Sequence, residues 1–386
     1  MTAFDQRLVT VFNVGSLTFG RGAALRCAED LAAAGAASLF LVTTPPTRGL
    51  CAPMAARLEA LGVRVTIWDG LAGEPTLAEF DAALAAARAA RADMVVGLGG
   101  GSAMDVAKLV AALFDGAQAI GDVIGVDRLE RRALPLACIP TTAGTGSEVT
   151  PIAILGDEDE DLKKGVVSRH LVPDAAYLDP ELTVTMPRAV TAATGFDALT
   201  HCIEAYTSRF AHPIADGLAL AGIGLIAGSI ERACNQGDDL AAREAMLLAS
   251  LYGGMCLGPV NTAAVHALAY PLGGEFHIAH GVANALLLPH VMRFNLEAAP
   301  ERYAAVARAM GVTEAGDDRT VALLGVDRIV ALAERCGIQR HMAAFGIGAD
   351  AIPRMAAAAM TVTRLLERNP RTVTGADAVR IFEAAL

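Results

Sequence analysis

The amino-acid sequence predicts a chain of two domains, an α/β domain with a Rossmann-like parallel sheet followed by an all-α domain. Three observations support this. The chain has 386 residues, which is long for one domain and suited to two. Before residue 187, short runs of β-branched and apolar residues without alternation are separated by helical segments, the pattern of a parallel sheet covered on both faces. After Met186-Pro187 nearly every segment has helical spacing.

The first half contains the strands and helices of the predicted α/β domain. Apolar strands are expected at 39–43, 63–68, 94–98 and 136–140, and helices at 49–61, 77–91 and 103–114. Residues 152–155 and 164–168 flank an acidic stretch, 157–161, which predicts a hairpin with a solvated turn.

The second half is expected to be helical throughout. Examples are the segments 215–230, 240–252 and 301–310. We therefore place the domains at 1–187 and 188–386. No linker or low-complexity segment separates them, so we expect tight packing with a cleft between the two.

Composition excludes several classes of protein. Hydrophobic residues make up 54% and charged residues 19%, so a large core is expected. The net charge of −11 argues against nucleic acid or an anionic membrane as a partner. We predict no membrane-spanning segment and no signal peptide. The seven cysteines are scattered and odd in number, which is typical of free thiols in a reducing cytoplasm.

A glycine-rich loop follows the predicted strand 94–98. Gly99, Gly100, Gly101 and Ser102 lead into a helix, where free backbone amides and the helix dipole favour an anion such as a phosphate. Ser102 is expected to cap the helix, with Asp105 as its capping-box partner. A tight turn that simply needs glycine explains these residues about as well.

A second polar loop runs from Pro140 to Glu148, after another strand end. It offers the hydroxyls of Thr141, Thr142, Thr145 and Ser147 to a phosphate, ribose or carboxamide. Open α/β sheets bind ligands at strand ends of this kind. A plain polar loop is the alternative.

Four residues of the helical half have the spacing of a metal site. Asp197 and His201 lie four apart on one helical face, as do His266 and Tyr270, and His280 follows a glycine-containing connection at 271–274 that is expected to reverse the chain. One carboxylate and three imidazoles can bind a divalent transition metal. Each residue alone is better explained as a core histidine or a surface pair, whereas the four together favour a metal.

Several long motifs in one order resemble the iron-containing (group III) alcohol dehydrogenase family over essentially the full chain. They lie at 99–102, 141–148, 179–183, 192–206 and 280–285. The resemblance implies a dehydroquinate synthase-like architecture of two domains, NAD or NADP in the cleft, and one divalent metal held by Asp197, His201, His266 and His280. The cofactor-binding residues that it implies are Thr44, Gly99, Gly100, Gly101, Ser102, Asp105, Thr141, Thr142, Thr145, Ser147, Lys163 and Leu182.

Two positions depart from the family pattern. The family often has a histidine near the substrate, four residues after the third ligand, where this chain has Tyr270. A phenol is a weak proton relay at neutral pH, although it can donate a hydrogen bond, and His277 is an alternative imidazole. Members that prefer NAD commonly have an aspartate where this chain has Thr44. Thr44 would not repel a 2′-phosphate, so we predict that NADPH is accepted.

The sequence thus predicts a cytoplasmic oxidoreductase that interconverts a small alcohol and its aldehyde or ketone by hydride transfer, with Fe²⁺ or Zn²⁺ as the Lewis acid. A homo-oligomer is expected. The alternatives are a reductase of hydroxy or oxo acids similar to maleylacetate reductase, a lyase of the dehydroquinate synthase type, and a nucleotide sensor without activity. The residues do not distinguish among small substrates.

Overall fold

The computed structural model describes residues 8–157 and 162–386. Contacts divide the chain into two compact units, which we call the α/β unit and the helical unit. The α/β unit comprises residues 12–142 and 146–185, and the helical unit comprises residues 186–386 together with two short earlier segments, of which 143–145 belongs to the second predicted loop. The predicted boundary at residue 187 lies beside the observed one at 185/186, but that prediction placed both short segments in the first domain.

The α/β unit is built on a parallel sheet of six strands in the order β1-β9-β6-β4-β2-β3. Its strands are β1 Ser16–Phe19, β2 Ser38–Val42, β3 Arg64–Trp68, β4 Met94–Gly99, β6 Leu136–Pro140 and β9 Ala175–Leu178. Its helices are α1 Ala23–Ala33, α2 Ala52–Ala60, α3 Leu77–Ala89, α4 Gly101–Leu113 and α5 Ile120–Val123. The predicted fold class is confirmed.

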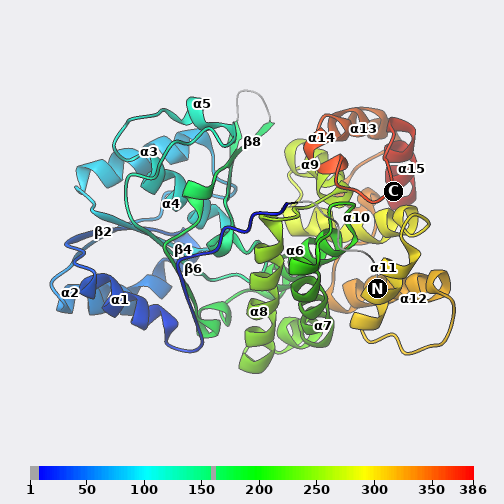
Figure 1. Ribbon diagram of the computed structural model, residues 1–386, viewed down its shortest axis with the longest axis horizontal. Coiled ribbons are helices and arrows are strands. Elements are labelled where there is room, and N and C mark those ends of the chain that lie inside the picture. Colours follow the sequence, from blue (N-terminus) through cyan, green and yellow to red (C-terminus); the bar gives the residue numbers. More distant parts are fainter. Residues whose placement is uncertain (1–7, 158–161) are drawn as a thin grey trace. The chain divides into compact units, whose positions relative to one another are not determined.

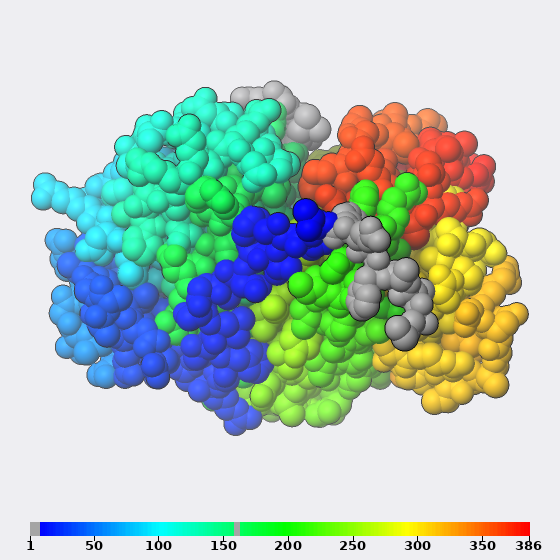
Figure 2. Space-filling model, viewed as in Figure 1, coloured from blue at the N-terminus to red at the C-terminus, as the bar shows by residue number. Residues whose placement is uncertain are grey.

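Helices cover both faces of this sheet (Figure 1). On one face α1 and α2 pack over Leu39, Leu41 and Val96, and on the other α3 and α4 pack over Phe40 and Val95. Successive residues of β2 thus enter different cores, which explains why this strand is apolar without alternation. Figure 2 shows the same division at the surface, where α1 and α2 in blue and α3 to α5 in cyan occupy separate areas.

A smaller sheet adds the predicted hairpin. It has the order β5-β8-β7, with β5 Gly125–Val126, β7 Ile152–Asp157 and β8 Leu162–Val167, and β7 and β8 are antiparallel. The predicted turn residues 158–161 lie outside the described part of the chain. Short 3₁₀ segments complete the unit: η1 Pro45–Cys51, η2 Ser147–Val149, η3 Arg169–Leu171 and η4 Pro180–Thr183.

The helical unit contains α6 to α15. Their bounds are α6 Arg188–Thr207, α7 Pro213–Asn235, α8 Leu240–Leu257, α9 Ala264–Phe276, α10 His280–Asn295, α11 Pro300–Ala309, α12 Asp318–Cys336, α13 Ile352–Met360, α14 Thr363–Leu366 and α15 Gly375–Ala385, with 3₁₀ segments η5 Met342–Phe345 and η6 Ala349–Ala351. α6 is central, because it packs against α7, α8 and α10.

Two of these helices test the prediction that no segment spans a membrane. By length and composition alone α7 and α8 could cross one, so the sequence criterion does not exclude it. Both helices pack against α6 and against each other, and such core helices pass the same test.

Glycines set how closely α6 meets its neighbours. A Cβ at Gly281 of α10 would lie 2.1 Å from the Ala193 carbonyl oxygen, and one at Gly195 of α6 would lie 2.7 Å from side chains of α7 and α8. Side chains at these positions would push the helices apart. Gly195 lies two residues before Asp197, and Gly281 directly follows His280. The helices therefore pack closely at the point where the Asp197 and His280 side chains meet.

Candidate metal centre and cofactor loops

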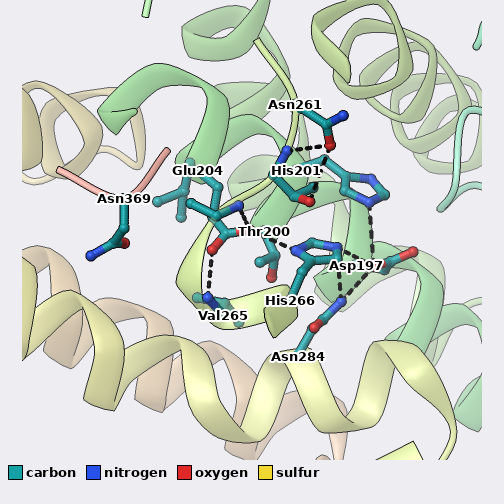
Figure 3. A network of polar contacts seen from close by, with 12 residues as sticks. Asp197, Thr200, His201, Glu204, Asn261, Val265, His266, Asn284 and Asn369 are labelled. Carbon is teal, nitrogen blue, oxygen red and sulfur yellow. Dashed lines mark hydrogen bonds and ion pairs between the residues drawn. The ribbon is translucent and has the colours of Figure 1, made fainter. Parts of the chain in front are cut away.

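The histidine cluster, by which we mean Asp197, His201, His266 and His280, forms inside the helical unit, and Figure 3 shows the first three of these side chains. Asp197 and His201 come from α6, His266 from the first turn of α9, and His280 from the start of α10. The Nε2 atoms of His201, His266 and His280 each lie 3.6 Å from Asp197 Oδ1. The structure therefore brings together all four residues that the sequence singles out.

These distances suit a single metal ion. Donor atoms at about 2.1 Å from a tetrahedral metal are about 3.4 Å apart, close to the separations seen here. Donor atoms of Asp197, His201 and His266 also all lie within 4.8 Å of one another. Three imidazoles and one carboxylate suit Fe²⁺ or Zn²⁺. The donor set thus fits the implied metal.

Burial and charge in the cluster oppose each other. Burial alone would raise the pKa of Asp197, but the imidazoles of His201 and His280 and the hydrogen bond with His266 lower it well below its ordinary value. Burial lowers the pKa of His201. It also disfavours a charged His266, yet Glu204 and Asp197 raise the pKa of this imidazole to about 9. The cluster is therefore an environment that favours positive charge beside Asp197.

Sequence reasoning missed two residues of this network. Glu204 of α6 accepts a hydrogen bond from the His266 ring at 2.6 Å. Asn284 of α10 donates to Asp197 Oδ1 at 2.8 Å, and its Nδ2 lies 3.2 Å from Nε2 of both His266 and His280. Helical spacing could have indicated both, since Glu204 lies three residues after His201 and Asn284 lies four after His280.

The connection between α9 and α10 differs from the prediction. Residues 271–274 do not reverse the chain, because Pro271 lies inside α9, which continues to Phe276. The reversal occurs at His277, whose φ of 53° is left-handed. The buried face of α9, with Val265, Leu268 and Leu272, stabilises the helix enough to offset the proline.

The two alternatives for a proton-transferring side chain are placed differently. Tyr270 lies one turn after His266 in α9 and is half-buried. His277 is exposed at the turn. The structure thus distinguishes the two side chains by their burial.

In the α/β unit, the first residues of the second predicted cofactor loop lie beside the glycine-rich loop. The Thr141 N–H donates to the Gly99 carbonyl at 2.9 Å, and a Cβ at Gly100 would touch the Thr142 side chain at 3.4 Å. The Thr141 hydroxyl is buried without a hydrogen-bond partner among the described residues. Gly99, Gly100, Thr141 and Thr142 therefore lie close together where β4 and β6 end.

The prediction that Ser102 caps α4 is wrong. The helix begins at Gly101, and its N-cap is Gly100, whose extended backbone makes no side-chain cap. Asp105 instead accepts hydrogen bonds from the Ser147 hydroxyl at 2.6 Å and the Ile154 N–H at 2.9 Å. Neither Ser102 nor Asp105 caps the backbone N–H groups in the first turn of α4. Uncapped N–H groups at a helix start favour the binding of an anion.

The remaining predicted cofactor residues are spread over the chain. Thr44 follows β2, and its hydroxyl bonds that of Thr47 at 2.7 Å. Thr145 belongs to the segment grouped with the helical unit. Lys163 of β8 pairs with Glu74 at 2.8 Å, and Leu182 of η4 packs on the core under α1 and α2.

A second buried polar group, the lysine cluster, lies in the α/β unit and was not predicted. We use this name for Asp105, Lys108, Ser147, Glu148 and Thr150. The buried Lys108 ammonium donates to Ser147 Oγ at 2.7 Å, Thr150 Oγ1 at 3.0 Å and the Ile152 carbonyl at 2.8 Å. Glu148 is buried, and its Oε1 has no hydrogen-bond partner among the residues described. Burial raises the pKa of Glu148 to about 7, and Lys108 opposes that rise.

Glycine- and threonine-rich loops at strand ends of the α/β unit and a metal-type donor set in the helical unit are the parts expected of a dinucleotide- and metal-dependent oxidoreductase. Comparison with known proteins gives the family. Residues 15–180 match the iron-containing alcohol dehydrogenase model, and residues 191–386 match the C-terminal model of the Fe-containing alcohol dehydrogenase family. The chain belongs to the iron-containing alcohol dehydrogenase family.

Relatives match along nearly their whole length. Long-chain-alcohol dehydrogenase 1 of Geobacillus thermodenitrificans is 39% identical over 95% of this chain and 94% of its own. The crystal structure of a 1,3-propanediol oxidoreductase superposes with a TM-score of 0.95 at 34% identity, covering 98% of this chain and 100% of that one. Sulfoacetaldehyde reductase from Bifidobacterium kashiwanohense, solved with NAD⁺, gives a TM-score of 0.88 at 28% identity, covering 98% and 99%.

These comparisons confirm the predicted family and enzyme class. The chain is an oxidoreductase of the iron-type alcohol dehydrogenases, enzymes that interconvert alcohols and aldehydes with a nicotinamide cofactor. Iron is the metal after which the family is named, in agreement with the predicted Fe²⁺.

Proposed function

We propose that Asp197, His201, His266 and His280 bind a divalent metal, Fe²⁺ or Zn²⁺, and that the enzyme interconverts a small alcohol and its aldehyde or ketone. The single observation that carries this proposal is the convergence of three Nε2 atoms on Asp197 Oδ1. A metal held there would supply Lewis acidity that polarises the substrate C–O bond.

The residues around the donors orient them. Asn284 donates a hydrogen bond to Asp197 and so fixes the carboxylate. Tyr270, one turn after His266, is proposed to donate a hydrogen bond to the substrate oxygen. The apolar packing of α9 and α10 against their neighbours limits water at the site.

In the α/β unit, we propose that Gly99, Gly100, Gly101 and Ser102 receive the pyrophosphate of NAD or NADP, and that Thr141 and Thr142 bind it from the second loop. The support is their proximity and the unpaired Thr141 hydroxyl. Thr44, Asp105, Thr145, Ser147, Lys163 and Leu182 remain predicted cofactor residues. Of these, Asp105 and Ser147 hold the second loop to α4, and Thr44 carries no charge that would repel a 2′-phosphate.

Three further predictions accompany this assignment. All seven cysteines are free and buried, which supports the proposal of a cytoplasmic location. We propose a homo-oligomer, a dimer or larger, and neither nucleic acid nor a membrane as a partner, in keeping with the net charge of −11. A carboxylate substrate, such as a hydroxy or oxo acid, remains the alternative.

A substrate panel tests the function. The purified chain is loaded anaerobically with Fe²⁺, or with Zn²⁺, and assayed with aldehydes, ketones and oxo acids using NADH and NADPH. Small aldehydes should give the highest kcat/KM, and chelation should abolish turnover. Preference for oxo acids would favour the alternative, and full activity in the chelated enzyme would refute a metal at this cluster.

A further inference from the structure

Glu204 is a buried carboxylate that contacts three polar groups at the start of α9 (Figure 3). Its Oε1 accepts from the Val265 N–H at 2.6 Å. Its Oε2 accepts from the Ala263 N–H at 2.9 Å and contacts His266 Nδ1 at 2.6 Å. One side chain of α6 therefore makes contacts with three polar groups of another helix.

The two backbone bonds determine the role of this carboxylate. Backbone N–H groups can only donate, so both oxygens of Glu204 act as acceptors. The two amides belong to the helix start, where such groups lack partners within the helix and where negative charge is favoured. The turn into α9 is set by Asn261, with a φ of 75°, which directs the chain toward Glu204.

The third bond then fixes His266. With both carboxylate oxygens accepting, His266 carries a hydrogen on Nδ1, so Nε2 is the ring nitrogen left to lose its proton and bind a metal. That Nε2 faces Asp197 Oδ1 at 3.6 Å. It is the atom that a metal would bind.

We propose that Glu204 is a positioning residue for the metal site: it caps α9 and, in the same contact, sets the tautomer and orientation of His266. This inference rests on the proposed metal function. A carboxylate on the far nitrogen of a metal-binding imidazole increases its basicity, and loss of such a partner typically weakens metal binding 10–100-fold. Glu204 should therefore govern metal affinity without touching the metal.

The test compares metal binding by the wild-type chain and by Glu204→Gln. Glutamine has nearly the same shape, but its amide NH₂ must face either Val265 N–H or the pair formed by Ala263 N–H and His266. We expect the Kd for Zn²⁺, measured by chelator competition, to rise about 10–100-fold. The visible absorption of the Co²⁺-loaded protein should also shift, because the His266 donor changes.

A matched control separates positioning from simple capping. Asp377 is a buried carboxylate of the same unit that accepts from the Thr374 N–H at 2.9 Å in a helix cap. Asp377→Asn should lower the melting temperature of the metal-free protein while leaving the Zn²⁺ Kd and the Co²⁺ spectrum unchanged.

The outcomes are distinct. A folded Glu204→Gln protein with wild-type Zn²⁺ affinity and Co²⁺ spectrum would show that Glu204 is only a helix cap. A wild-type chain that takes up no metal would overturn the proposed metal site and, with it, this inference. Should Glu204→Gln fail to fold, ¹⁵N NMR of the Zn²⁺-loaded wild type decides. The His266 signal, identified by its loss in His266→Ala, should show Nδ1 protonated, and protonation at Nε2 would refute the proposal.

Discussion

The histidine cluster and the lysine cluster are both buried and polar, but they differ in where positive charge comes from. In the lysine cluster Lys108 lies among oxygen atoms and supplies the cation itself. In the histidine cluster a carboxylate and three imidazoles face one another, and the imidazoles lower the pKa of Asp197 against the effect of its burial. Converging donors with no lysine or arginine at their centre, among the described residues, agree with the external cation that we propose, whereas a cluster with its own cation is consistent with a structural role.

The largest effect should come from removing a donor of the histidine cluster. His266→Ala takes away one of the three Nε2 atoms, so we expect kcat to fall about a thousandfold or more, or about 4 kcal/mol in the barrier. Titration with NADPH, followed by its fluorescence, should show unchanged cofactor binding. His341→Ala, an exposed histidine of the same unit, is the control. A wild-type kcat in His266→Ala would contradict the assignment of the histidine cluster, and not the lysine cluster, to catalysis.

Removing the cation of the lysine cluster should instead affect stability. Lys108→Met removes the cation that attracts the carboxylates of Asp105 and Glu148, and losing one partner of such a buried pair typically costs about 3–5 kcal/mol of unfolding free energy. Denaturant unfolding measures this, and metal content per folded chain should stay constant. Lys163→Met, whose partner Glu74 is exposed, should cost below about 1 kcal/mol. A loss of bound metal in Lys108→Met would contradict the separation of roles.

The sequence predicted the histidine cluster better than the network around it. Asp197 and His201 share one helix, so their spacing alone places them together. His266 and His280 were assigned correctly as neighbours of that pair, although the chain reverses at His277 rather than at 271–274. Proline and glycine at 271–274 predict a turn from local propensity. The packing of α9 against other helices outweighs that propensity, and such long-range contacts cannot be predicted from neighbouring residues alone.

Short elements and long-range partners were harder to predict. The strands β1 and β9 have four residues each and became recognisable only through their pairing with each other. The lysine cluster joins Lys108 to residues about 40 positions later, so no local spacing indicates it. Ser102 was expected to cap α4, but Gly100 already has the extended backbone that ends the loop.

The pH dependence of stability sharpens the comparison further. Burial holds the pKa of Glu148 at about 7, above its ordinary value of 4.5. Folding thus favours the protonated form, and this contribution is complete below about pH 4.5 and lost as pH rises through 7. The free energy of unfolding of Glu148→Gln, relative to wild type, should therefore increase from pH 5 to pH 8, by at most about 3 kcal/mol. Glu59→Gln, on the exposed face of α2, should show little change with pH. A difference that stays constant with pH would show that Glu148 does not titrate in the folded chain.

The smallest expected effect concerns Thr44, which lies in the α/β unit but outside both clusters. An aspartate there would accept hydrogen bonds from the ribose hydroxyls of NADH and repel the 2′-phosphate of NADPH. We expect Thr44→Asp to shift the ratio of kcat/KM for NADH over NADPH about tenfold toward NADH, or about 1.4 kcal/mol. Thr44→Val, which removes the hydroxyl bond to Thr47 without adding charge, should leave the ratio nearly unchanged. Because the substitution acts on the cofactor alone, the Zn²⁺ Kd should match wild type in both variants. An unchanged ratio in Thr44→Asp would mean that the adenosine ribose does not bind at the end of β2.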